Sequence, residues 1–95
     1  MLAQLKSAPQ ETVTVVQKYY PNPATNIINF ELSKVADKLS ILQVYNFMGK
    51  KVYETYPTTQ FFSVLLDGFY RGVYIFQLRN RYGKIIDSGK FQVVK

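Results

Sequence analysis

The pattern of apolar and polar positions along the chain predicts an all-β protein. Apolar and polar residues alternate at 12–15 and 28–32, and longer apolar runs follow at 39–45, 52–56, 61–66, 73–78 and 91–94. Short runs rich in β-branched and aromatic residues, separated by turn residues at this spacing, are typical of sandwiches and barrels. No window of helical length has a 3.6-residue period. We therefore expect about seven strands, with a further candidate at residues 84–88.

We expect these strands to form an antiparallel two-sheet sandwich with an immunoglobulin-like or Greek-key order. Strands in a sandwich bury one face each, so apolar residues from several runs must meet between the sheets. The candidates for this core are Phe30, Leu32, Ile41, Val44, Val52, Leu66, Val73, Ile75 and Val93.

Two short segments have the composition of hairpin turns. Asn46-Phe47-Met48-Gly49 precedes Lys50, and Arg81-Tyr82-Gly83 precedes Lys84. A tight hairpin needs a residue with positive φ, which Gly49 and Gly83 can supply without a steric penalty. The chain shows no internal repeat, so these turns are treated as separate features.

Residues 20–26, YPNPATN, predict a rigid corner before the second strand. Pro21 and Pro23 fix their own φ angles, and each restricts the residue before it to extended geometry. Neither proline can donate a hydrogen bond to a ladder, so the segment must lie at a sheet edge or cross between sheets. After the turn, Ile28, Phe30 and Leu32 would form the buried face.

Composition excludes several kinds of chemistry. The 95 residues suit one domain, and they include neither Cys nor His. A cysteine nucleophile, a disulfide framework, a Cys/His zinc site and a Ser-His-Asp triad are therefore impossible. The carboxylates are scattered, and neither a phosphate-binding loop nor a calcium-binding loop is present. We expect no enzymatic activity, no cofactor and no metal.

Charge is concentrated late in the sequence. The net charge is +6, of which residues 1–70 contribute +1 (six Lys against five acids) and residues 71–95 contribute +5 (six Lys and Arg against Asp87). Such a bias favours polyanions or an acidic protein surface, although exposed strands also use charge to protect their edges. No run reaches the length of a membrane span. Residues 1–10 lack a secretory h-region and are expected to be a linker or tail before a domain at 11–95.

Several short motifs occur in a distinctive order. Tyr-Pro-Asn-Pro-Ala opens the series at 20–24, a strand ending at Tyr45 leads to Gly49-Lys50, Gly72-Val73-Tyr74 follows, and Lys90 to Lys95 closes it. This order resembles the type A C-terminal sorting domain of Bacteroidetes proteins exported by the type IX, or Por, secretion system. The matching positions are Pro21, Asn22, Pro23, Tyr45, Gly49, Lys50, Gly72, Tyr74, Lys90 and Lys95. Asn46 replaces the usual Asp, and Phe69 replaces the usual Leu.

The resemblance implies that the domain acts as an address. Domains of this family direct a periplasmic cargo, joined upstream in the same precursor, through the outer-membrane translocon to the cell surface or the medium. A sortase-like protease commonly removes them, and anionic lipopolysaccharide is a further candidate partner. Asn46 keeps the turn propensity of Asp and loses only its charge.

Other functions remain open at this point. The eight Tyr could form a stacking platform in a glycan- or protein-binding adhesion module. Residues 71–76 resemble an RNA-recognition strand, but that fold needs two helices, so we expect no nucleic-acid binding. Structural roles also compete: Gly49 and Gly72 could serve only the backbone, and Lys90 and Lys95 could protect edges. We expect Tyr45 and Tyr74 to be half-buried, with their hydroxyls at the surface.

Overall fold

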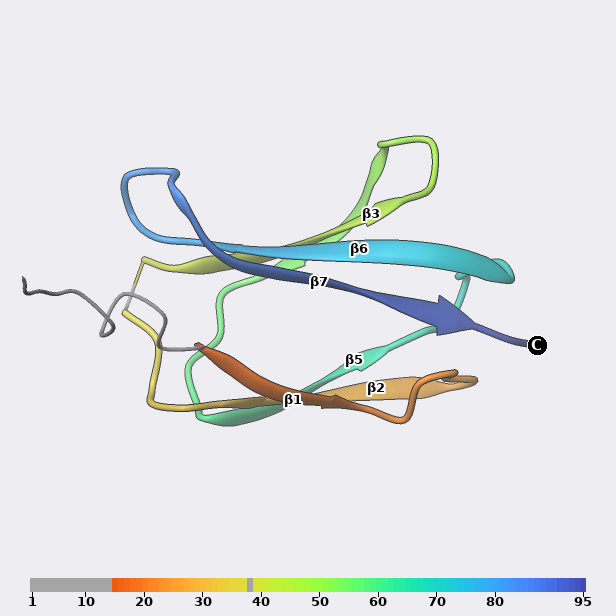
Figure 1. Cartoon of the computed structure of the whole chain (residues 1–95), viewed down its shortest axis with the longest axis horizontal. Helices are drawn as coiled ribbons and strands as arrows, with labels where there is room; N and C mark the ends of the chain where they lie inside the picture. The colour runs from red at the N-terminus through yellow and green to blue at the C-terminus, as the bar shows by residue number, and fades with distance from the viewer. Residues whose placement is uncertain (1–14, 38) are drawn as a thin grey trace, which may run out of the picture.

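The computed structural model describes residues 15–37 and 39–95, and every regular element in them is a β-strand (Figure 1). The predicted all-β fold is confirmed. The strands are β1 Val16–Tyr20, β2 Ile27–Leu32, β3 Ile41–Asn46, β4 Lys51–Thr55, β5 Phe61–Leu65, β6 Gly72–Arg79 and β7 Ile85–Val93. The expected linker at residues 1–10 lies outside the described residues, so the domain boundary stays a prediction.

The strands form two antiparallel sheets packed face to face. One sheet has the order β1-β2-β5 and the other β4-β3-β6-β7. The chain thus changes sheet between β2 and β3, between β4 and β5, and between β5 and β6. This is the immunoglobulin-like arrangement that we predicted, with the fourth strand paired to the third instead of joining the first sheet.

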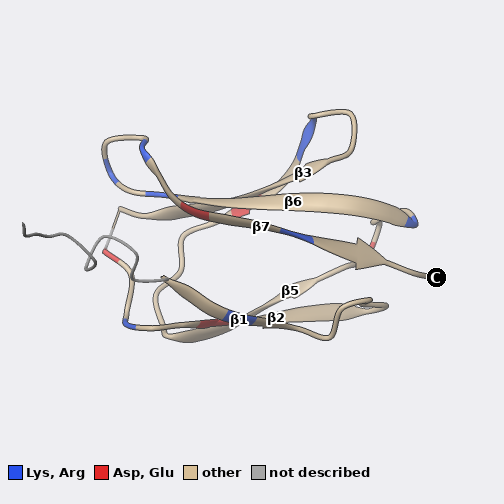
Figure 2. Ribbon diagram, viewed as in Figure 1, with Lys and Arg blue, Asp and Glu red and all other residues tan. Residues whose placement is uncertain are grey.

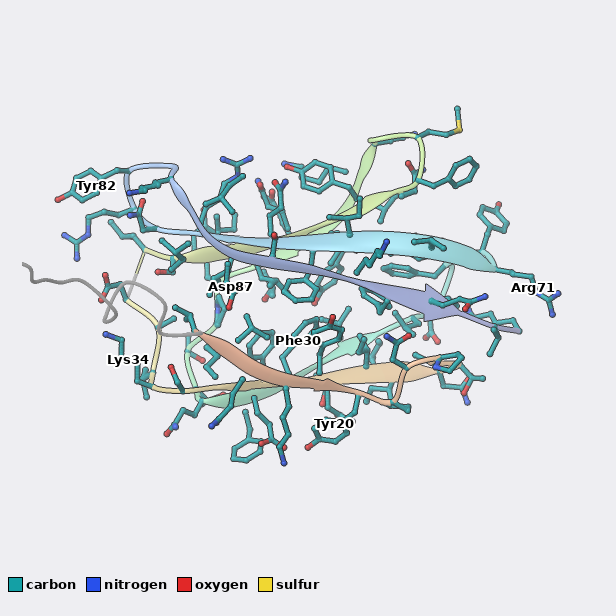
Figure 3. All side chains as sticks on the ribbon, viewed as in Figure 1. Tyr20, Phe30, Lys34, Arg71, Tyr82 and Asp87 are labelled. Carbon is teal, nitrogen blue, oxygen red and sulfur yellow. The ribbon has the colours of Figure 1, made fainter. Side chains whose placement is uncertain are left out.

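Aromatic side chains fill the centre of the space between the sheets. Phe30 of β2 and Phe76 of β6 meet edge to face with ring centroids 5.1 Å apart. Tyr19 approaches Phe76 from the β1 side at 4.8 Å, and Phe62 stacks on Phe30 at 5.3 Å. Figure 3 shows Phe30 between the two layers. Burying one such ring contributes about 1.5–3 kcal/mol, so this cluster is a main source of stability.

The predicted core is partly wrong. Phe30, Leu32, Val44, Leu66 and Val93 are buried as expected, whereas Ile41 is only half-buried and Val52, Val73 and Ile75 are exposed. In β6 both alternating sets contain apolar residues, and the set that faces inward is Tyr74, Phe76 and Leu78. Ile41 is on the opposite face of β3 from Leu42 and Val44, and Val52 lies at a bulge in the β3–β4 ladder.

The first and last strands also differ from the prediction. The expected strand at 12–15 falls mainly outside the described residues, and β1 runs from Val16 to Tyr20 instead. A register shift between Val16 and Lys18 leaves Val16 and Tyr19 on the inner face three positions apart, which hides the period of two. The candidates at 84–88 and 91–94 are parts of one continuous strand, β7.

Asp87 of β7 joins the two sheets on the side where β1 and β7 are the edges. Its carboxylate Oδ2 accepts hydrogen bonds from the backbone N–H groups of Val15 at 3.1 Å and Val16 at 2.7 Å. Figure 3 shows Asp87 between β7 and the start of β1. Hydrogen bonds to a charged acceptor contribute about 1.5–3 kcal/mol, so Asp87 fixes where β1 begins.

Gly89 makes room for the central aromatic cluster. It lies opposite Phe76 in the β6–β7 ladder, and a Cβ added there would be 2.7 Å from two atoms of the Phe76 ring. The same Cβ would be 3.0 Å from the Tyr19 hydroxyl. Because Phe76 is itself held by Phe30 and Tyr19, its ring cannot move aside without disturbing the core.

We expect Gly89→Ala to lower the free energy of unfolding by about 1–3 kcal/mol, the usual effect of overpacking a filled core. Urea denaturation of the variant measures this directly. Ser88→Ala, on the exposed face of the same strand, is the control and should change stability little. The loss should also shrink when Gly89→Ala is combined with Phe76→Leu. A Gly89→Ala protein as stable as the parent would contradict the packing described here.

Candidate functional site: the motif end

The Pro-Asn-Pro corner pairs with the last strand. The Ala24 N–H donates to the Gln92 carbonyl at 2.8 Å, and the Val94 N–H donates to the Ala24 carbonyl at 2.8 Å. The Asn22 side-chain Oδ1 accepts from the Gln92 N–H at 2.9 Å. The corner thus crosses from the three-stranded sheet to the edge of β7, as its prolines predicted. It brings together two motif segments that are 70 residues apart in sequence.

The end of the chain is fastened to the β5–β6 connection. The Lys95 ammonium donates to the Leu66 carbonyl at 2.6 Å, and Arg71 Nη2 donates to the Lys95 carbonyl at 2.9 Å. Lys95 therefore has a structural role. Lys90, by contrast, is exposed and lies opposite Ile75 on the outer face of the sheet.

The β3–β4 hairpin is organised by Asn46. Its side-chain Oδ1 accepts hydrogen bonds from the backbone N–H groups of Met48 at 2.9 Å and Lys50 at 3.0 Å. Gly49 has φ of 83°, which confirms the predicted turn, and Phe47 and Met48 stand exposed at the tip. Since Asp offers the same oxygen acceptor, the Asn-for-Asp replacement preserves this loop.

The β6–β7 hairpin is built in the same way around Asn80. Its Oδ1 accepts from the N–H groups of Tyr82 at 2.9 Å and Lys84 at 3.1 Å, and Gly83 has φ of 82°. The shared pattern is Asn-x-x-Gly-Lys, at 46–50 and again at 80–84. The expectation of no internal repeat is therefore wrong at this local scale, because the same spacing of Asn, Gly and Lys occurs twice.

The two predicted motif tyrosines have different environments. Tyr45 is half-buried as expected, and its hydroxyl donates to Gln43 Oε1 at 2.9 Å. Tyr74 is buried, with 5% of its surface exposed, which corrects the expectation of a hydroxyl at the surface. Its buried hydroxyl donates to the Tyr70 carbonyl at 2.7 Å, which satisfies it away from solvent. Gly72, with φ of 153°, begins β6.

All the predicted motif residues gather at one end of the sandwich. We call this the motif end and define it as residues 20–24, 45–50, 66–74 and 90–95. The corner, the β3–β4 hairpin, the β5–β6 connection and the end of β7 lie together on the right in Figure 1. β1 begins at the opposite end of the molecule. Antiparallel pairing explains this arrangement. Each motif segment lies where a strand begins or ends, and the pairing brings these strand ends to the same side of the sandwich.

Two of the shallow hollows at the surface of the motif end are bordered by a lysine of the motif. One, of about 240 Å³, lies between the β3–β4 hairpin and the β5–β6 connection, and its lining includes Lys50, Asp67 and Tyr70. The other, of about 220 Å³, lies beside the corner and is lined by Asn22, Val73, Lys90, Phe91 and Gln92. Lys50 and Lys90 thus each border a concave surface that a partner could occupy.

The positive charge of the last quarter is divided between the two ends. Arg71, Lys90 and Lys95 belong to the motif end, whereas Arg79, Arg81 and Lys84 lie at or near the β6–β7 hairpin at the other end (Figure 2). The sequence suggested one basic face, and the antiparallel pairing of β6 and β7 separates it into two. Each end therefore has a modest basic field.

Ionisable groups with shifted pKa values lie on the outer faces of the sheets. The hydrogen bond from Lys51, with a second from Gln43, lowers the pKa of the Glu54 carboxyl, and the same contact with Glu54 raises the pKa of Lys51. The hydrogen bond to Glu31 raises the pKa of Tyr20. These groups are solvent-exposed, so they mark local contacts and contribute little to stability.

The described residues contain no cluster of three or more His, Cys, Asp or Glu that could hold a metal ion. In residues 15–37 and 39–95 there is also no helix capable of crossing a membrane. What the motif end offers is a set of rigid backbone segments, exposed cations and small hollows, which is a surface suited to recognition by another macromolecule.

The comparisons with known proteins give a family and a fold likeness. The model of the family described as "Secretion system C-terminal sorting domain" matches residues 18–93, so the chain belongs to that family. A search of curated proteins gave no match. A solved structure of PorZ from Porphyromonas gingivalis is similar in fold, with a TM-score of 0.66 and 18% identity. The likeness covers 82% of this chain and 11% of that protein, which is described as an essential bacterial surface component of the type IX secretion system.

We expect Asn22→Ala to lower the free energy of unfolding by about 0.5–1.5 kcal/mol, because the Gln92 N–H loses its side-chain acceptor. Amide hydrogen exchange at Gln92 should become faster in the variant. Thr25→Ala, an exposed change in the same turn, is the matched control. Unchanged exchange at Gln92 would show that Asn22 does not hold the corner to β7.

At the β3–β4 hairpin, Asn46→Ala should reduce stability by about 0.5–1.5 kcal/mol, because Met48 and Lys50 lose their common acceptor. Asn46→Asp keeps that acceptor and should retain most of the parent's stability. Thermal and urea unfolding of the two variants provide the comparison. Equal losses for Asp and Ala would mean that the side-chain oxygen does not organise the loop.

Proposed function

We propose that this domain is the sorting signal of an exported protein, directing an upstream cargo from the periplasm through the type IX outer-membrane translocon. The observation that carries the proposal is the family membership together with the assembly of the family's motif segments at one end of the fold. The fold likeness to PorZ, a component of that secretion system, supports the same context.

The geometry suits an address that must be accessible while a cargo is attached. A cargo joined before β1 would lie at the end opposite the motif end, so its bulk would leave the corner and both hollows free. The exposed members of the motif are the corner residues, Gly49, Lys50 and Lys90, with Lys95 held by Leu66. We therefore assign direct recognition to the corner, Lys50 and Lys90, and a structural role to Tyr74 and Lys95.

Processing fits the same arrangement. Cleavage by a sortase-like protease before β1 would separate cargo from signal without breaking any ladder of the sandwich. Cleavage would create a new end on the cargo, and that end would be the part joined to anionic lipopolysaccharide. The domain's part is recognition, and catalysis belongs to the machinery.

The alternative of a glycan-binding module has less support. Such a role needs several aromatic rings on one surface, and the most exposed tyrosines are far apart in the fold. Tyr70 belongs to the motif end, and Tyr56 directly follows β4 in the four-stranded sheet. Tyr20 is on the outer face of the three-stranded sheet and Tyr82 is at the tip of the β6–β7 hairpin (Figure 3). They do not form a common stacking platform.

An export assay tests the proposed function. Residues 11–95 are fused behind a passenger with its own inner-membrane export signal and produced in a bacterium that has the type IX system. We expect the passenger at the cell surface or in the medium. A folded fusion that stays in the periplasm would refute the sorting function.

Charge variants then locate the recognition surface. We expect Lys50→Gln with Lys90→Gln to reduce export several-fold, because both cations border the hollows of the motif end. Arg81→Gln with Lys84→Gln removes equal charge from the other end and should leave export unchanged. Lys95 is kept, since its bond to Leu66 would confuse stability with recognition. Equal export by both variants would refute the assignment of Lys50 and Lys90.

A further inference from the structure

β5 is an edge strand without the features that normally prevent edges from associating. The four edge strands of the two sheets are β1, β5, β4 and β7. The start of β1 is bonded by Asp87, the end of β7 is paired with the corner, and β4 carries the Lys51–Glu54 ion pair. β5, with the sequence FFSVL, has no charge and no proline. Exposed apolar edges of this kind pair readily with another strand.

The free backbone groups of β5 can be assigned from the ladder. The Leu32 N–H donates to the Gln60 carbonyl, and the Leu66 N–H donates to the Asn26 carbonyl. Even-numbered residues of this segment therefore direct their N–H and C=O groups toward β2. Phe61, Ser63 and Leu65 direct theirs to the open side, where no described segment pairs with them. The Phe61 carbonyl accepts a bond from the Thr59 hydroxyl and retains a second lone pair.

The side chains of β5 form a symmetric pattern about Ser63. Phe62 and Val64 face the core, whereas Phe61 and Leu65 lie on the outer face with 64% and 62% of their surfaces exposed. An antiparallel strand centred on Ser63 would place an apolar residue opposite each of these two. Phe61 would meet Leu65 of the incoming strand, and Leu65 would meet Phe61. β5 is thus complementary to itself under a two-fold rotation.

We propose that a second copy of this chain binds along β5, so that two domains pair antiparallel about Ser63 and their three-stranded sheets become one continuous sheet. A second copy fits because self-complementarity satisfies both partners at once and closes the assembly as a dimer. The strand brings no like charges into opposition. The inference concerns the isolated domain and does not rest on the sorting function.

Sedimentation equilibrium of the full chain tests this dimer. The apparent mass should rise with concentration from 11.0 kDa toward twice that value, and amide exchange at Ser63 and Leu65 should slow in parallel. Ser63→Pro should keep the chain monomeric, because the Ser63 N–H faces the open side and no backbone bond to β2 is removed. The one bond to β2 that is lost is the exposed bond from the Ser63 hydroxyl to Asn29 Oδ1. Leu65→Lys, which puts a charge at the interface, should do the same if the proline variant folds poorly. Tyr82→Lys, which puts the same charge at an exposed position of the far hairpin, should dimerise like the parent.

Three results would overturn the proposal. The first is a parent chain that remains monomeric up to about 1 mM. The second is a dimer that persists unchanged in a folded Ser63→Pro or Leu65→Lys chain, which would place the interface elsewhere. The third is a dimer in which the exchange of Ser63 and Leu65 does not slow.

Discussion

The edge-to-face contact between Phe30 and Phe76 is the interaction on which the rest of the structure depends. These two rings, with Tyr19 and Phe62 around them, join strands from both sheets at the centre of a small domain. The chain has no cysteine, and its described residues contain no cluster that could hold a metal ion. Their size requires space on the neighbouring strand, and Gly89 provides it. The positions of β2, β6 and β7 follow from this packing, and so does the position of every segment that continues from them.

Polar contacts at the edges of the two sheets add to the stability that the aromatic core provides. On the side where β1 and β7 are edges, Asp87 bonds the start of β1 and the corner bonds the end of β7, one contact near each end of the sandwich. The corner is also part of the motif, so one segment both closes the fold and displays the surface that we assign to recognition. At Asn22 the structural role and the assigned recognition role therefore fall on the same side chain. At Lys90 the two roles can be separated.

Local sequence patterns predicted those features that depend on near neighbours. The alternation of Ile28, Phe30 and Leu32 fixed the inner face of β2, and the glycines of both hairpins indicated their turns. The same approach predicted the wrong inner face for β6, because Val73 and Ile75 are as apolar as the residues that face inward. Gln77 and Arg79, which share a face with Val73 and Ile75, mark the outer set, and on the partner strand Gly89 makes room for Phe76.

The candidate site likewise combines features that local sequence predicted with features that depend on distant contacts. The order of the motifs predicted a set of site residues, and antiparallel topology explains why these residues lie at one end of the fold. The bond from Lys95 to Leu66 and the bond from Gln92 to Asn22 join distant segments, and neither has a local signature. The Asn-x-x-Gly-Lys loops could be predicted from sequence, because in each loop the Asn side-chain oxygen accepts hydrogen bonds from two backbone N–H groups of the same turn.

The placement of the two ends of the fold also determines how the domain would respond to mechanical load. A cargo before β1 and a receptor at the motif end would pull along the strands in opposite directions, at opposite ends of the sandwich. Tension in that direction shears the β1–β2 and β6–β7 ladders, so many hydrogen bonds share the force instead of parting one after another. Resistance to such pulling is governed by the rate of unfolding under force. Under the proposed function, the topology that separates cargo from address would also let the domain act as a tether under tension.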